Sequence, residues 1–244
     1  MHLLYHELNP EPQNYSYIVD QRNFGKQLDL FQSREIMNGI EVKVTFDDGH
    51  ASDYSIALPL LVERGMAAHF FITAGWIGER RGFMSWPELR ELHDAGQQVG
   101  AHGWSHKLLT HCDRGELHVE LVRARELLED KLGTQITTIS FPGGRFNGHV
   151  LAACAEAGYT KMFTSTPQVA TLPDSDLIGR LNVRGDWDVT FMGSLLDPES
   201  KSLKKLQRQD KFKAMAKSVL GDFLYRRVWA IANRSTSSLM DAAE

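Results

Sequence analysis

The order of apolar and polar residues predicts an α/β fold in which a parallel sheet or barrel is flanked by helices. Short apolar runs alternate along the chain with longer amphipathic stretches. The connections between them are short, which is typical of repeated strand–helix units. A chain of 244 residues, 42% of them hydrophobic, is long enough for a single barrel domain with a sizeable core.

Each expected strand is a short apolar run that ends near a turn residue or a helix start. The run 40–46 alternates apolar and polar residues with period two and leads into the turn at Gly49. We expect strands at 3–5, 40–46, 67–72, 98–101, 136–141, 159–164 and 177–183, the last with the weakest pattern.

Helices are expected between these strands, and their ends follow capping rules. Ser52 is placed to cap a helix that stops at Gly65, and Ser85 opens another with Pro87 in its first turn. The expected helices span 24–31, 52–64, 85–95, 115–132 and 150–157, and the last three end at Gly96, Gly133 and Gly158.

The charge distribution divides the chain into two expected domains. The net charge is −4, which gives no overall basic signature for nucleic acid. Residues 201–234, however, hold ten basic and only two acidic residues, with apolar residues at roughly helical spacing among them. We therefore expect a catalytic-type domain at 1–197 and a basic helical extension at 198–244. That extension either contacts an anionic membrane surface or packs its apolar stripe on the barrel.

The sequence has no recognisable signal peptide, which favours a cytoplasmic protein. The first fifteen residues contain neither the basic region nor the apolar stretch of a signal peptide, and no run approaches a membrane-spanning length. The two cysteines, Cys112 and Cys154, lack the spacing of a metal or disulfide framework. We expect a cytoplasmic location, with peripheral contact at the inner membrane if the basic extension binds lipid.

Adjacent carboxylates at the end of an expected strand are the first chemical signal. Asp47 and Asp48 follow the strand 40–46, and the carboxyl ends of parallel strands are where α/β barrels build their sites. Two neighbouring carboxylates repel each other, and a cation would relieve that repulsion. One aspartate could then bind a metal while the other accepts a proton from water. A solvated Asp-Asp-Gly turn is the alternative.

Two histidines four residues apart form the second signal. His102 and His106 follow the strand 98–101, and in a helical turn residues at this spacing share a face and can meet one metal ion. His2 and His6 have the same spacing, so the pair alone is weak evidence. Together with the aspartates it suggests an Asp/His/His set for catalytic Zn²⁺ or a related divalent ion.

The Thr45–Gly49 block (TFDDG) followed by the His102–His106 block resembles the first two motifs of the polysaccharide deacetylase (NodB-homology) family, carbohydrate esterase family four. The resemblance runs from about Leu4 to about Asp188. It implies a distorted (β/α) barrel of about seven parallel strands. It also implies a metal-dependent hydrolase that removes N-acetyl or other N-acyl groups from an amino-sugar glycan, as in exopolysaccharide biosynthesis.

By the same resemblance, Asp47 is the catalytic base, and Asp48, His102 and His106 bind the metal. The expected ion is Zn²⁺, with Co²⁺, Ni²⁺, Fe²⁺ and Mn²⁺ as alternatives. The third and fourth motifs resemble segments whose residues are expected to bind the carbohydrate: Phe141, Pro142, Gly143, Gly144, Arg145, Asp186 and Trp187.

Two departures from the family pattern leave roles open. The family often has an arginine two residues before the proline of its third motif, where it holds the base; here Ser140 stands there, so Arg145 or Arg180 would substitute. The family's late histidine is also missing. The apolar strand ending in His6 resembles a rearranged branch that includes poly-N-acetylglucosamine deacetylases, which makes His6 the expected general acid and His50 the second choice.

Two other functions remain open on the sequence alone. One is hydrolysis of a different C–N bond, such as a formamido sugar or a small cyclic amide, within the same fold. The other is a carbohydrate-binding domain that has lost catalysis, which the two departures favour and the intact Asp and His pairs oppose.

Overall fold

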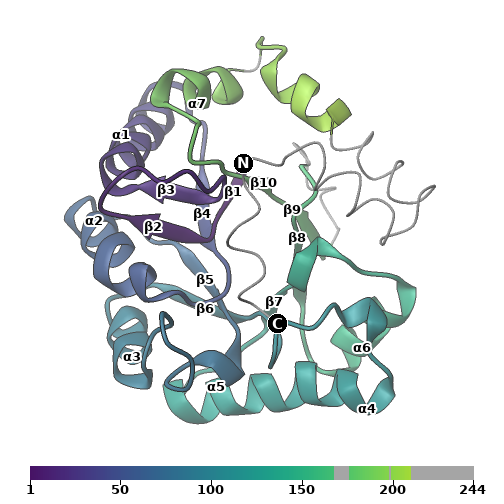
Figure 1. Ribbon diagram of the computed structural model, residues 1–244. Coiled ribbons are helices and arrows are strands. Elements are labelled where there is room, and N and C mark those ends of the chain that lie inside the picture. Colours follow the sequence, from purple (N-terminus) through teal and green to yellow (C-terminus); the bar gives the residue numbers. More distant parts are fainter. Residues whose placement is uncertain (168–175, 198, 210–244) are drawn as a thin grey trace.

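The computed structural model describes residues 1–167, 176–197 and 199–209, and within them a parallel sheet curls into a nearly closed barrel (Figure 1). The order of its eight strands is β10-β1-β4-β5-β6-β7-β8-β9, and every recorded pairing is parallel. The strands are β1 (His2–Tyr5), β4 (Lys43–Phe46), β5 (His69–Ile72), β6 (Gln98–Ala101), β7 (Thr138–Ser140), β8 (Lys161–Thr164), β9 (Leu177–Gly179) and β10 (Leu181–Asn182).

One segment closes the barrel. Strand β9 pairs with β8, and after the single residue Arg180 the chain continues as β10, which pairs with β1. The strand expected at 177–183 is therefore two short strands that bond to opposite neighbours. This arrangement joins the first strand to the last, as expected for a barrel in which β1 carries part of the site.

Helices surround the barrel, as the alternating pattern predicted (Figure 1). They are α1 (Gln21–Asn38), α2 (Leu58–Glu63), α3 (Trp86–Asp94), α4 (Arg114–Leu117), α5 (Ala124–Leu132), α6 (Gly148–Glu156) and α7 (Val189–Leu196). Two π-helical segments, Asp53–Ala57 and His118–Arg123, precede α2 and join α4 to α5. No helix in the described part of the chain is long and apolar enough to span a membrane.

Several helix ends match the expected caps, and one does not. Ser85 and Glu88 form a reciprocal capping box at the start of α3, and Gly133 adopts a left-handed conformation after α5. The expected cap at Ser52 is wrong. Its hydroxyl accepts a hydrogen bond from Leu8 N at 3.0 Å and pairs with His50 Nδ1 at 2.8 Å. The side chain therefore links the Leu8 backbone to the turn at His50 and makes no capping hydrogen bond to the helix.

Some elements lie outside the expected pattern. Strands β2 (Glu7–Asn9) and β3 (Ile18–Asp20) form a separate two-stranded sheet beside the barrel, and α1 is longer than expected. Of the expected basic extension at 198–244, the structure describes residues 199–209, which include a helix at 202–209. The remainder of that extension and its apolar stripe lie outside the described residues, so its membrane contact stays a prediction.

The barrel holds aromatic rings around a half-buried histidine. His69 stacks on Phe71 at 4.2 Å and contacts Phe163 at 5.5 Å, while its Nε2 lies 2.9 Å from Thr138 Oγ1. Burial, together with the charge of Arg180, lowers the pKa of His69 to about 3. The imidazole is therefore neutral in the folded protein at neutral pH.

We expect stability to fall on acidification because of His69. Its pKa rises to about 6.5 on unfolding, so below that value the unfolded chain takes up the proton preferentially. The loss should reach about 2 kcal/mol near pH 5 relative to neutral pH. Urea unfolding of wild type and His69→Gln at both pH values would measure it. An equal pH dependence in the two proteins would contradict the assignment.

Candidate active site and metal centre

Four polar side chains meet at the carboxyl ends of β4 and β6. Asp48 Oδ1 lies 3.3 Å from His102 Nε2 and 3.4 Å from His106 Nε2, and Asp47 Oδ2 lies 3.8 Å from His102 Nε2. One ligand atom from each of Asp48, His102 and His106 lies within 4.8 Å of the other two. The structure therefore brings together the two aspartates and two histidines of the sequence motifs.

Two of these residues have unusual backbones. Asp48 (φ 80°) and His106 (φ 63°) are the non-glycine residues with positive φ within the ranges that the structure describes. Such conformations cost energy and persist where surrounding contacts fix them, often at functional sites. The helical reason given for the His102–His106 spacing is wrong, since residues 102–108 form a loop that bends at 104 and 105 and has a left-handed residue at His106. The two rings still lie 5.0 Å apart.

A buried glutamate holds the loop that carries His106. Glu120, in the π-helical segment, accepts hydrogen bonds from Trp104 N at 2.8 Å, from Ser105 N at 3.0 Å and from the Ser105 hydroxyl. A Cβ at Gly103 would lie 2.7 Å from Glu120 Oε2, so the loop needs glycine there. Sequence reasoning missed Glu120, which looked like one of many charged residues on a long helix.

The three-residue set fits a divalent cation. The His102 ring places Nδ1 2.9 Å from the Ser140 carbonyl oxygen, so Nε2 faces Asp48. Asp48 Oδ1 is buried and lacks a well-aligned hydrogen bond, although two ring nitrogens lie close to it. Burial alone would lower the pKa of His102, yet the charges of Asp47 and Asp48 raise it. The site thus favours positive charge at the point where the three ligand atoms converge.

Arg180 fixes the orientation of Asp47. The guanidinium donates to both carboxylate oxygens at 2.7 Å and to the Ser140 hydroxyl at 2.6 Å, and that hydroxyl donates to Asp47 Oδ2 at 2.9 Å. Burial opposes ionisation of Asp47, but the charges of Arg180 and His102 outweigh it and hold the pKa of Asp47 below its ordinary value. Of the two arginines considered as substitutes, Arg180 is the one paired with Asp47.

His6 lies beside this group, and His50 is engaged elsewhere. His6 follows β1, next to β4 in the sheet, and the charges of Asp48 and Asp47 act on its ring. Burial lowers the pKa of His6, and those two carboxylates partly offset the decrease. His50 places Nδ1 2.8 Å from Ser52 Oγ, and its Nε2 lies 4.0 Å from Glu7 Oε2.

The expected carbohydrate-binding residues occupy varied environments. Phe141 and Pro142 are buried, with Phe141 stacked on Phe146 at 5.3 Å, and Gly143 is exposed in the short helical turn Pro142–Gly144. Gly144 and Arg145 are half-buried in the same loop. Trp187 is buried near the start of α1, where its carbonyl accepts hydrogen bonds from two α1 side chains, and Asp186 forms an exposed ion pair with Arg184 at 3.1 Å.

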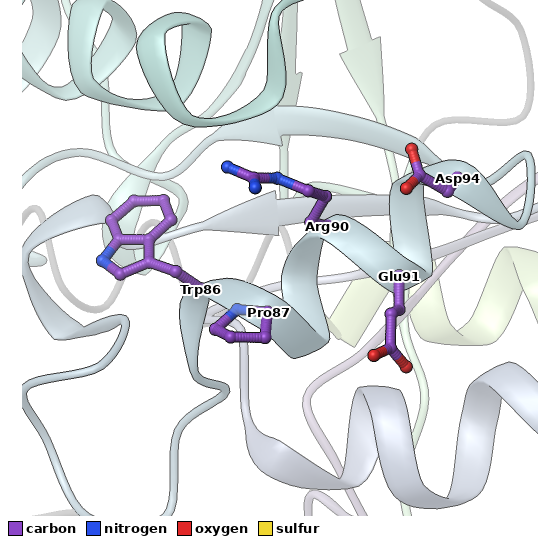
Figure 2. A pocket seen from close by; sticks show the side chains of 5 residues that line it. All are labelled: Trp86, Pro87, Arg90, Glu91 and Asp94. Atoms are coloured by element: carbon purple, nitrogen blue, oxygen red, sulfur yellow. The ribbon is translucent and has the colours of Figure 1, made fainter.

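A surface depression of about 260 Å³ lies on α3 and is lined by none of these residues (Figure 2). Trp86, Pro87, Arg90, Glu91 and Asp94 line it. Two of its polar side chains already have partners: Arg90 donates to the Lys131 carbonyl, and Glu91 accepts from the Tyr54 hydroxyl. We therefore place the reaction site at the Asp/His cluster, where unpaired ligand atoms converge.

Comparison with known proteins identifies the family of the chain. The family model for polysaccharide deacetylases matches residues 35–162, slightly more than half of the chain. YxkH of Bacillus subtilis is 29% identical over 130 residues, which is 53% of this chain and 46% of YxkH. Peptidoglycan-N-acetylglucosamine deacetylase PgdA of Listeria monocytogenes is 30% identical over 110 residues, 45% of this chain and 22% of PgdA. The chain thus spans less than half the length of these relatives.

Solved structures show the same fold. Deacetylase PplD of Streptococcus pyogenes superposes with a TM-score of 0.72 at 19% identity, over 81% of this chain and 97% of PplD. IcaB of Ammonifex degensii superposes with a TM-score of 0.66 at 24% identity, over 86% of this chain and 96% of IcaB. With the match of the family model, these findings show that the chain belongs to the polysaccharide deacetylase family.

Proposed function

We propose that this protein is a metal-dependent hydrolase that removes N-acetyl groups from an amino-sugar-containing glycan or glycan precursor. The observation that carries the proposal is the pairing of an Asp48/His102/His106 set with an adjacent, arginine-held Asp47. Relatives named for peptidoglycan N-acetylglucosamine and for chitin support an N-acetylated amino sugar as the substrate.

We assign the metal to Asp48, His102 and His106, with Zn²⁺ as the expected ion. Two imidazole nitrogens and one carboxylate leave open coordination positions, as catalytic zinc sites do. When bound, the ion supplies Lewis-acid polarisation of the acyl carbonyl and acidification of water.

The residues of this chain then divide the proton transfers of amide hydrolysis. Asp47 is ionised at neutral pH. One of its carboxylate oxygens takes a proton from the attacking water while the water oxygen bonds to the acyl carbon. Arg180 and Ser140 keep that carboxylate in one orientation. The C–N bond then breaks as protonated His6 delivers a proton to the departing nitrogen. The sugar leaves as the free amine and the acyl group as acetate, and Asp47 and His6 return to their starting forms by proton exchange with solvent.

Replacing His6 by alanine is expected to lower kcat by roughly 100-fold, because the amine would leave without its proton donor. His50→Ala is the matched control and should stay within a few-fold of wild type, since His50 bonds to Ser52. Acetate release would be measured for both at saturating substrate. A His6→Ala enzyme with unchanged kcat would remove His6 from the mechanism, leaving the metal assignment intact.

The test of the proposed function combines metal analysis with acetate release from N-acetylglucosamine oligomers. We expect one zinc ion per chain and acetate release that chelation abolishes and zinc restores. Asp48→Ala should lose both the bound zinc and the acetate release. An Asp48→Ala protein that kept metal and turnover would overturn the assignment. Bound zinc without acetate from any oligomer would point to another acyl group, such as formyl.

The contact between Arg180 and Asp47 favours an enzyme over a domain that only binds carbohydrate. One reason to consider loss of catalysis was the missing arginine of the third motif. Arg180 reaches the same carboxylate from the closing segment of the barrel, so Asp47 is held as a base despite Ser140. A domain that only bound carbohydrate would tolerate Asp47→Asn without a change in function, whereas the proposed enzyme would not.

A further inference from the structure

An arginine is held over an aromatic ring that touches the metal set. The Trp76 ring lies 5.3 Å from the His106 ring, and the Arg80 guanidinium lies 4.3 Å above the Trp76 ring and 5.2 Å from the Phe83 ring. Trp76 and Phe83 pack at 4.7 Å from each other. A single indole therefore separates a proposed metal ligand from a guanidinium at the surface.

The position of this cluster is fixed by backbone contacts. The loop after β5 hydrogen-bonds to the loop that carries His106, through Ala74 N to Gly103 O at 3.0 Å and Gly75 N to Trp104 O at 2.9 Å. A Cβ at Gly75 would lie 2.6 Å from Trp104 O, so only glycine allows this approach. Trp76 is consequently placed against His106 by the main chain.

Arg80 has no carboxylate partner within the described ranges. Its contacts there are the two aromatic rings, and the side chain is exposed. Lys107, the cation that follows His106, is by contrast paired with Glu116 at 2.9 Å. The Trp76 indole already contacts Phe83, His106 and Arg80. The group of this cluster that is available to a ligand is therefore the Arg80 guanidinium.

We propose that Arg80, supported by Trp76 and Phe83, is an anion-binding subsite next to the reaction centre, for a carboxylate or phosphate carried by the amino-sugar substrate. The planar guanidinium matches both groups in two-point hydrogen bonding, and its stacking on the rings reduces the ordering cost of binding. The inference rests on the proposed function, because it assumes that an N-acetylated sugar lies beside His106.

Binding by the zinc-loaded full-length chain tests the subsite without relying on turnover. One arm compares a hyaluronan tetrasaccharide, which carries uronate carboxylates, with neutral chitotetraose. The other compares N-acetylglucosamine 1-phosphate with N-acetylglucosamine. We expect at least one anionic ligand to bind about tenfold more tightly than its neutral counterpart, as a charge-assisted hydrogen bond would give. The arm that shows the preference identifies the anion.

Two neighbouring arginines provide the matched variants. Arg80→Gln should abolish the preference for the anionic ligand, and Arg81→Gln, an exposed change on the same loop, should retain it. Equal affinity for charged and neutral ligands in both arms would overturn the proposal. So would a preference that survives Arg80→Gln, or one that both variants remove. If no acetate is released but the Arg80-dependent preference persists, the deacetylase proposal fails and the subsite stands.

Discussion

Asp47→Asn is expected to lower kcat/KM by about 10²- to 10⁴-fold while the protein still binds one zinc ion per chain. The amide keeps the shape of the carboxylate but cannot accept the proton of the attacking water. Asp47 lies 3.8 Å from His102 Nε2, farther than Asp48, and is already occupied by Arg180 and Ser140. Its loss should therefore leave the three assigned ligands in place. Zinc content and acetate release, measured on the same preparation, check the retained metal and the lost turnover.

Asp48→Asn is the matched change at the neighbouring position. It should weaken zinc binding first, with loss of turnover as a consequence that excess zinc partly reverses, because an amide oxygen is a poorer ligand than a carboxylate. The two aspartates would have the wrong roles if Asp47→Asn lost the metal and Asp48→Asn kept it.

Arg180→Met is expected to destabilise the protein by about 3–5 kcal/mol, because it leaves the Asp47 carboxylate buried without its ion-pair partner. Both side chains are almost fully buried, 0% and 2% exposed. The variant also loses the hydrogen bond from Arg180 Nε to the Thr164 carbonyl at 3.1 Å. Urea unfolding of the metal-free protein at neutral pH measures the change.

A second substitution separates the unpaired charge from lost packing. Arg180→Met combined with Asp47→Asn should recover part of the stability, because the buried charge is then gone. The proposed cause would be wrong if the double variant were as unstable as the sum of the two single variants.

Much of the fold was predictable because it depends on local pattern. Apolar runs such as Lys43–Phe46 and His69–Ile72 form strands, and Ser85 begins a helix through its own side chain. Strands β2 and β3 were missed because each is only three residues long and carries little periodic signal.

The site was predictable where its residues come in motifs. Asp48, His102 and His106 meet as the motifs suggested, although the backbone that brings the histidines together is not helical. The partner of Asp47 was left between two arginines, because 133 positions separate Asp47 from Arg180 in sequence and only the folded barrel makes them neighbours. Glu120 and Trp76 were not identified because their importance lies in which loops they touch.

Arg180 stands at the junction where β9 ends and β10 begins, so the segment that closes the barrel also carries the partner of Asp47. A local opening of this seam would withdraw the guanidinium from Asp47 while Asp48, His102 and His106, in the loops after β4 and β6, could still hold their ion. Such an opened molecule would be folded, metallated and inactive. Amide hydrogen exchange at Val183, whose N–H donates to the Leu4 carbonyl at 2.8 Å across this seam, would therefore report the fraction of opened molecules, which metal content cannot do.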